Sequence, residues 1–504
     1  MNTRAHLDPA ASPEGAGRPA TRERRQRSQL RRTLTYSQKD AVASATMTAS
    51  SDNYLNAFAI YLQASAAQLG LLTALPQLFG ALMQVLSIWL GRLIPRRKLV
   101  YGTALMQTGV VAALALLALP FLGSGLSSSD ASISDKVPWL IGLVVLYHSC
   151  LNLIQPQWRA WMGEIVPRRR RGAFFAARTR LSMAASLAVF LGGGAMMSGF
   201  QHLGLVGFGF ALLFILAATG RAFSSYYLWR MHDPAERREQ TDSVVAGTGP
   251  QARFGSLRDY VSDRDFRHYT LFIAGMQGMV AISAPFFAVY MLEELHFTYL
   301  QFALNNIASV ATQFALLGFW GRFSDRHGNR LVMLLTSCLV PLLPVLWLFS
   351  DSHLYLLLVQ VISGFAWSGF SLSTANFLYD IRPHKTNFAA YAAVQQAVSA
   401  TAVFFGALFG AYCATQASAI LDALPVSLQL ASPLFLVFLI SGVLRAGMTL
   451  WFIPRCKEPR IRKRPQMLQI VFRVARFNPI SGIVLDWLTV TRKRKDNGDR
   501  PVDS

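Results

Sequence analysis

Twelve apolar runs, each about twenty residues long and so able to cross about 30 Å of hydrocarbon, constrain the fold of this chain most. Backbone amides find no partner in lipid, so a chain that crosses it in such runs must be helical. The sequence therefore predicts an all-α membrane protein with twelve transmembrane helices. The runs lie near residues 41–63, 69–90, 99–122, 138–162, 174–199, 203–228, 269–292, 299–320, 331–350, 353–379, 388–412 and 432–453.

The positions of the basic residues predict which side of the membrane each connection faces. The chain has 48 Lys and Arg against 26 Asp and Glu. Nearly all the cations lie in the two termini and in connections after even-numbered helices, whereas connections after odd-numbered helices hold only Lys136. This positive-inside pattern places both termini in the cytoplasm. Attraction to anionic membrane lipids accounts for the basic excess, so we expect no nucleic acid as a partner.

The two halves of the chain repeat one plan. Glu164 matches Asp380 in the connections after the fourth and tenth runs, and Arg221 matches Arg445 in the sixth and twelfth runs. Such anchors, in the same order, indicate a tandem repeat of six helices. The predicted domains are a disordered, basic N-terminal tail (1–36), a six-helix bundle (37–230), a cytoplasmic linker (231–268), a second bundle (269–455) and a basic C-terminal tail (456–504) with an interfacial helix or a partner-binding segment.

Polar side chains inside the apolar runs mark candidate functional positions. Asp52 lies near the middle of the first run, where an ionisable group is costly and is expected to face water or a partner. In the fourth run, His148, Asn152, Gln155 and Arg159 recur at steps of three or four and share one face. For Asp52 and His148 the alternative is a hydrogen bond that only holds packed helices together.

Metal, redox and enzyme chemistry have no support in the sequence. The four cysteines are isolated, so we expect neither a disulfide nor a metal site. No nucleophile–base pair is recognisable, and we expect no cofactor and no enzymatic activity. The first 36 residues lack the apolar core of a cleavable signal peptide. In the eleventh run, Gly406 and Gly410 have the small-xxx-small spacing that predicts close helix packing.

The stretch after the eighth run resembles the signature Gly-x-x-x-Asp-Arg-x-Gly-x-Arg of the major facilitator superfamily. Each fixed position matches: Gly321, Asp325, Arg326, Gly328 and Arg330. The related hairpin after the second run departs from the pattern, since Pro95 stands where the acid should be. The segment from Trp158 to Arg178 is similar to the helix 4–5 region of bacterial members.

The resemblance implies two pseudo-symmetric six-helix bundles that alternate about a site at the middle of the membrane, lined by helices 1, 4, 7 and 10. The proton-coupling candidates are Asp52 and His148. Pseudo-symmetry predicts that Asp325 pairs with Arg178 or Arg180 as a cytoplasmic latch, while Glu164 and Asp380 pair with the hairpin arginines on their own sides. The substrate-contact candidates are Asp52, Asn56, Asn152, Gln155, Gln277, Trp367 and Ser371.

The predicted function is secondary active transport of a small solute by a monomer in the bacterial cytoplasmic (inner) membrane, with protons as the candidate coupling ion. Two alternatives stay open. One is a transporter-like receptor or assembly factor that moves no solute, which the long basic C-terminal tail favours. The other is drug or metabolite efflux by proton antiport. The drug-antiporter pattern places a proline among glycines in helix 5, and Gly192–Gly194 has none.

Overall fold

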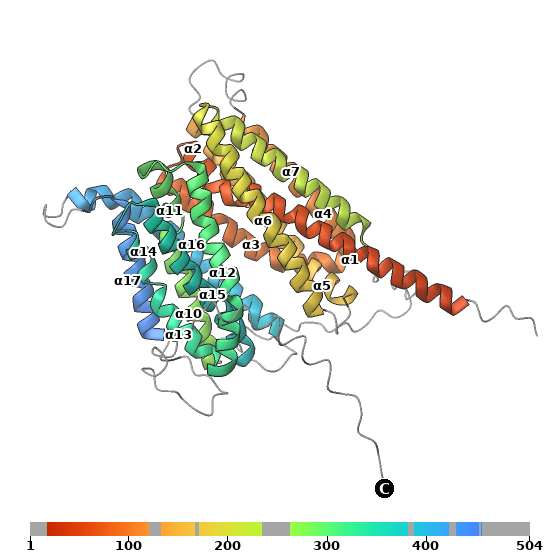
Figure 1. Ribbon diagram of the computed structural model, residues 1–504. Helices are drawn as coiled ribbons and strands as arrows, with labels where there is room; N and C mark the ends of the chain where they lie inside the picture. Colours follow the sequence, from red (N-terminus) through yellow and green to blue (C-terminus); the bar gives the residue numbers. More distant parts are fainter. Residues whose placement is uncertain are drawn as a thin grey trace, which may run out of the picture. The chain divides into compact units, whose positions relative to one another are not determined.

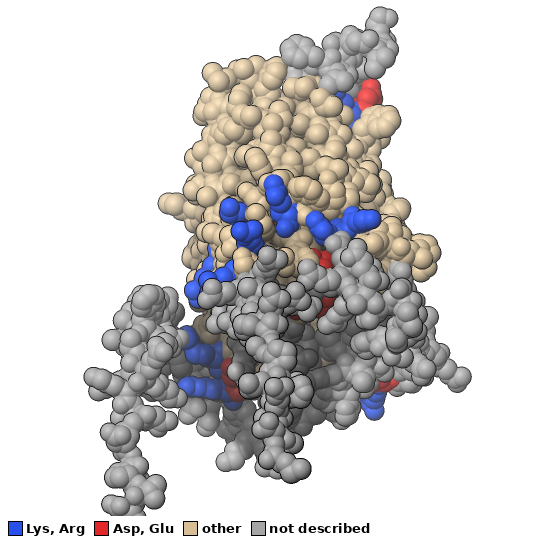
Figure 2. Space-filling view, turned by 90° about the vertical axis from the view of Figure 1, so that its right-hand side faces the viewer, with Lys and Arg blue, Asp and Glu red and all other residues tan. Residues whose placement is uncertain are grey.

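The computed structural model describes residues 18–119, 133–166, 171–233, 263–381, 388–422, 430–452 and 455. Every regular element in these ranges is helical (Figure 1). Eleven helical segments have the length and composition to cross a membrane, and the chain is a multi-pass membrane protein. Figure 2 shows Lys and Arg gathered in a band beside a broad surface that has very few charges.

The chain divides into two compact units, residues 1–63 with 79–249 and residues 64–78 with 250–504. The boundary at 249/250 falls inside the predicted linker. Helix α3 (Ala66–Leu93) contributes to both units. Its first part belongs to the second unit because Ala74 packs with Ala281 and Ala407 there.

The N-terminal unit is built on helices that pack along their lengths. Helix α7 packs on α1 and α4, and α6 packs on α1 (Figure 1). Its elements are α1 (Arg18–Ser50), η1 (Asp52–Tyr54), α2 (Leu55–Tyr61), α4 (Arg96–Ala118), η3 (Ile133–Lys136), α5 (Val137–Ile165), α6 (Arg171–His202) and α7 (Val206–Arg230), together with the end of α3.

The first predicted run, 41–63, differs most from its prediction and is not among the eleven candidate spans. Helix α1 begins at Arg18, inside the segment predicted as a tail, and a 3-10 turn separates it from α2. Ser50 Oγ donates to the Thr46 carbonyl at 2.7 Å, and Ser51 Oγ to the Met47 carbonyl at 2.7 Å. Serine hydroxyls that bond the preceding turn compete with the helix ladder, which accounts for a break directly before Asp52.

Proline interrupts two of the predicted runs in the C-terminal unit. The run 269–292 separates at Pro285, and the run 331–350 separates at Pro341. Proline lacks the N–H that continues a helix. The elements of this unit are α10 (Arg264–Ser283), α11 (Phe286–Val289), the π-helix η5 (Tyr290–Glu294), α12 (Tyr299–His327), α13 (Asn329–Leu339), α14 (Leu342–Leu346), α15 (His353–Ile381), α16 (Phe388–Asp422) and α17 (Leu434–Phe452).

Helices α10 and α16 approach each other closely, as the glycine spacing in the eleventh run predicts. A Cβ atom on Gly406 would overlap the Gly278 carbonyl, and one on Gly410 would overlap the Ile282 carbonyl. Only glycine fits where two backbones touch in this way. The interfacial helix predicted for the C-terminal tail lies outside the described residues.

Candidate functional site

The two proton-coupling candidates form one pair in the N-terminal unit. Asp52 Oδ1 lies 3.3 Å from His148 Nε2, and the two side chains are 33% and 23% exposed. Asp52 opens the 3-10 turn between α1 and α2, so the helix break projects its carboxylate toward α5. The pair can hold a proton at a place that is only partly open to solvent.

The other two candidates on α5, Asn152 and Gln155, make hydrogen bonds within the N-terminal unit. Asn152 Oδ1 accepts from Gln84 Nε2 at 2.7 Å, and Asn152 Nδ2 donates to the His148 carbonyl at 2.8 Å. The Asn152 side chain therefore links α3 to the helical turn of α5 that begins at His148. Gln155 is exposed and accepts from Arg159 at 3.1 Å, whereas Asn56 is half-buried on α2.

Three substrate-contact candidates belong to the C-terminal unit. Gln277 is half-buried on α10 and Ser371 is exposed on α15. Trp367 is half-buried and packs edge-on against Phe370, with ring centroids 5.5 Å apart. A cavity shared by these residues and those of the N-terminal unit stays a prediction.

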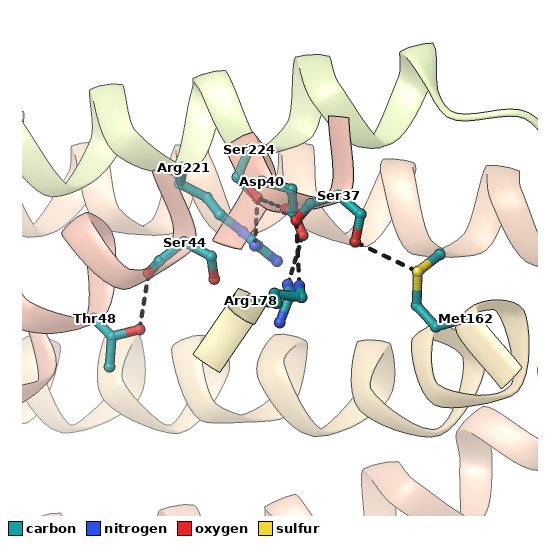
Figure 3. Close-up of polar contacts among 8 residues, drawn as sticks. All are labelled: Ser37, Asp40, Ser44, Thr48, Met162, Arg178, Arg221 and Ser224. Carbon is teal, nitrogen blue, oxygen red and sulfur yellow. Dashed lines mark hydrogen bonds and ion pairs between the residues drawn. The ribbon is translucent and has the colours of Figure 1, made fainter. Parts of the chain in front are cut away.

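A second charged cluster in the N-terminal unit was not predicted. Asp40 is only 3% exposed, and its Oδ2 lies 3.0 Å from Arg178 Nη2 (Figure 3). Ser224 Oγ donates to Asp40 Oδ1 at 2.7 Å, and Arg221 Nη1 donates to the same hydroxyl oxygen at 3.1 Å. We call these four residues the Asp40 cluster. It joins α1, α6 and α7.

The sequence held one signal for this cluster. Asp40, Ser44, Thr48 and Asp52 recur every four residues, which places them along a slowly turning stripe of one helix. Asp40 lies one residue before the first apolar run, next to Lys39, where a charged residue is expected at the end of a membrane helix. Its position therefore gave no reason to single it out. Figure 3 shows Ser44 and Thr48 farther along α1 from Asp40.

Arg178 has further contacts inside its own unit. Its guanidinium lies over the Trp158 ring at 4.2 Å from the centroid, and its Nε donates to the Ser37 carbonyl at 3.2 Å. Asp40 is thus the carboxylate that Arg178 contacts in the N-terminal unit. The latch between Asp325 and Arg178 or Arg180 would join the two units, and it stays a prediction.

The signature hairpin of the C-terminal unit turns at Gly328. This residue separates α12 from α13 with φ +89° and ψ 154°, a conformation essentially restricted to glycine. The Gly328 N–H donates to the Ser324 carbonyl at 2.7 Å and closes the helix end. Asp325 and Arg326 are exposed, Arg330 is half-buried, and Gly321 lies within α12.

The hairpin of the N-terminal unit is held by ion pairs instead. Arg96 lies 3.0 Å from Glu164, so the predicted contact between Glu164 and a hairpin arginine is present. Arg96 also contacts both carboxylate oxygens of Asp233, at 2.6 and 3.2 Å, which the sequence did not predict. The side chain of Asp380, the repeat counterpart of Glu164, lies outside the described residues.

These features define a class: helical membrane proteins of two compact units, with ionisable side chains between the helices. The sequence model described as Major Facilitator Superfamily matches residues 41–287 and 268–492. The chain belongs to the major facilitator superfamily, as the signature at the junction of α12 and α13 predicts. No curated protein matches the sequence significantly.

Solved structures of transporters share the fold at low sequence identity. The xylose transporter XylE from E. coli, in a partially occluded inward-open state, has a TM-score of 0.59 at 12% identity, covering 86% of this chain and 100% of that one. The nucleoside transporter NupG gives 0.56 at 12% identity, covering 84% and 99%. A bacterial homolog of the human lysosomal transporter Spinster gives 0.55 at 14% identity, covering 86% and 99%. Family membership and these folds support membrane transport.

Proposed function

We propose that this protein is a secondary active transporter of a small solute, with the Asp52–His148 pair as its proton-coupling site. The contact of 3.3 Å between the two side chains is the observation that carries the proposal. A carboxylate and an imidazole at that distance share a proton and exchange it as pH or solute binding changes. Ionisable groups at this depth in a membrane are expensive and mark functional sites.

The membrane arrangement of the proposal follows the sequence. Helix α1 with α2 is counted as the first of twelve transmembrane helices, both termini face the cytoplasm, and the protein is a monomer of the bacterial inner membrane. The one-sided distribution of Lys and Arg supports this orientation. Asp52 then lies near the middle of the first membrane crossing, and the basic hairpins face the cytoplasm.

The solute class needs a direct test, because a shared fold does not imply a shared substrate. Two of the similar structures are a nucleoside transporter and a xylose transporter. The side chains proposed for solute contact are mostly uncharged amides and hydroxyls, with Asp52 as the acid, which suits a polar neutral solute. A nucleoside and D-xylose are therefore the first solutes to test, and a cationic dye then tests for drug efflux.

The experiment is transport of radiolabelled uridine and D-xylose, and of ethidium, in proteoliposomes with an imposed pH gradient. We expect gradient-driven accumulation of one probe by the wild type and its loss in Asp52→Asn and His148→Gln. Exchange of that probe between the two sides without a gradient should survive in both variants, because the remaining side chains proposed for solute contact are unchanged. Asp265→Asn, which removes an exposed acid from the first turn of α10, is the matched control.

Other results would assign the chain differently. Accumulation that persists undiminished in Asp52→Asn would exclude this pair from coupling. Extrusion of ethidium would favour antiport of drugs or metabolites. Correctly folded protein that moves no member of a broad solute panel would favour the receptor or assembly factor.

A further inference from the structure

We propose that Tyr147, Arg221, Ser224 and Asp40 form an electrostatic relay, through which the protonation state of the Asp52–His148 pair controls how tightly Arg178 is held to α1. The inference rests on the proposed proton coupling. No proton moves along the relay: it stays on the Asp52–His148 pair, and only hydrogen bonds and ion pairs rearrange.

The first observation is that two arginines share one carboxylate. Asp40 accepts from Arg178 of α6 directly, at 3.0 Å, and reaches Arg221 of α7 through the Ser224 hydroxyl. Both Asp40 and Arg221 are 3% exposed. In such a low-dielectric place one carboxylate cannot serve two guanidinium groups equally, because its position decides which cation is neutralised.

The second observation is that Arg221 has buried N–H groups without hydrogen-bond partners. Its Nε and Nη2 are buried and have no hydrogen-bond partner among the described residues. Unpartnered donors of a buried cation are costly, so Arg221 gains if Asp40 moves toward it. The Asp40 cluster therefore has two arrangements, with the carboxylate on Arg178 or on Arg221.

The third observation connects the cluster to Asp52. Tyr147 of α5 is fully buried and packs in one core cluster with Ala217 of α7, one helical turn before Arg221, which places its phenol within range of the charges of Asp52 and Arg221. Its phenol oxygen lies 3.2 Å from Ser51 Oγ, within hydrogen-bond distance and one residue before Asp52. The buried thiol of Cys150 is the remaining titratable group beside Arg221.

These positions give the switch a direction. When Asp52 is ionised, its charge polarises Tyr147 and helps to balance Arg221, and Asp40 stays on Arg178. When the Asp52–His148 pair takes up a proton, its negative charge is cancelled, so Arg221 loses that support and draws Asp40 toward its free N–H groups. Arg178 then loses its ion pair with α1 and keeps the hydrogen bond from its Nε to the Ser37 carbonyl. Acidification should therefore loosen the inner end of α6, and raised pH should tighten it.

Trp158 reports the position of Arg178 without any transported solute, because the guanidinium lies over its ring. The measurement is the tryptophan emission of purified wild type minus that of Trp158→Phe, from about pH 5 to about pH 8, the range in which a histidine changes its charge. We expect a single sigmoidal change in wild type and its loss in Asp52→Asn. Tyr147→Phe and Ser224→Ala each remove one hydroxyl from the relay, and both should abolish the change.

Arg445→Met is the matched control, since Arg445 is the repeat counterpart of Arg221 and contacts no acid in the described part of its unit. It should leave the Trp158 titration as in wild type. Circular dichroism and gel filtration establish that each variant is folded. Tyr147→Phe changes a single oxygen, so it keeps the test usable if Ser224→Ala is unstable.

A Trp158 titration that survives unchanged in folded Tyr147→Phe and Ser224→Ala would overturn the relay, as would a wild type without any titration. The outcome is separable from that of the proposed function. Proton-driven transport with an unaffected Trp158 response would remove the relay alone. A Trp158 titration that depends on Asp52 and Tyr147, in a protein whose transport ignores the pH gradient, would remove proton coupling and keep the relay.

Discussion

The repeat predicted from the sequence pairs Arg221 with Arg445; both arginines are buried, and the two units compensate their charges differently. Arg221 in α7 is served by an acid, through Ser224 and Asp40. Arg445 in α17, 2% exposed, donates to the Val340 carbonyl at 3.3 Å and to Ser283 Oγ at 2.7 Å. A guanidinium can thus be buried beside a carboxylate or among neutral oxygens.

Helix breaks supply the neutral oxygens in the C-terminal unit. The Val340 carbonyl lies four residues before Pro344, which has no N–H to offer it. Ser283 ends α10 directly before the break at Pro285. Three residues after each arginine, Ser224 contacts Asp40, whereas Met448 packs over Gly275. Arg221 therefore belongs to an ion-pair network in the N-terminal unit. Arg445, its counterpart in the C-terminal unit, donates hydrogen bonds to oxygen atoms at two helix breaks caused by proline.

Asp40→Asn should have the largest effect on stability. It leaves the buried Arg221 and the half-buried Arg178 without their carboxylate, and a stranded buried charge costs about 3–5 kcal/mol. The measurement is the apparent free energy of unfolding in detergent. Lys39→Gln, which removes the exposed charge next to Asp40, is the control and should change little. An equally small loss for Asp40→Asn would mean that Arg221 does not depend on an acid.

Gly328→Ala tests the C-terminal hairpin, which depends on backbone conformation where the N-terminal hairpin depends on ion pairs. A side chain at φ +89° is strained, with an expected cost of about 1–3 kcal/mol in unfolding free energy. Gly318→Ala in the same helix is the control, because no atom lies within 4 Å of an added Cβ there. If the two variants unfold alike, Gly328 is not needed for the turn.

Substitutions of the two acids that contact Arg96 should differ in cost according to burial, and Glu164→Gln should have the smallest effect of the series. Asp233 is 1% exposed and Glu164 is 55% exposed at the side chain. Asp233→Asn should cost about 1.5–3 kcal/mol, the range for buried hydrogen bonds to charged groups. Glu164→Gln should cost less than about 1 kcal/mol, because exposed ion pairs contribute little. Chemical denaturation of both variants at low and high salt checks this order, and only the Glu164 effect should be sensitive to salt.

The sequence predicted much of the fold because its signals are local. Apolar length and the charge of each connection can be read along the chain, and eleven of the runs correspond to candidate spans. The first run fails as a continuous helix because two serines bond the preceding turn. The runs 269–292 and 331–350 contain prolines, yet their length alone suggested single helices.

The site was predictable only in part. Asp52 and His148 were found because each is ionisable inside an apolar run, but nothing local indicated that they pair across 96 positions. Asp40 was missed because it stands at the edge of a basic segment. Its partners Arg178 and Ser224 lie 138 and 184 positions away.

Taken by itself, the sequence determined the membrane-spanning character, the repeat and the signature hairpin of this protein. These features depend on the length and order of apolar and polar residues along the chain, because lipid accepts only apolar, internally hydrogen-bonded segments. Only the tertiary structure decided which charges meet. In a bundle, the partner of a buried group depends on how each helix is rotated and where it breaks. The repeat could therefore predict two equivalent arginines, but not that one would find an acid and the other the carbonyls of interrupted helices.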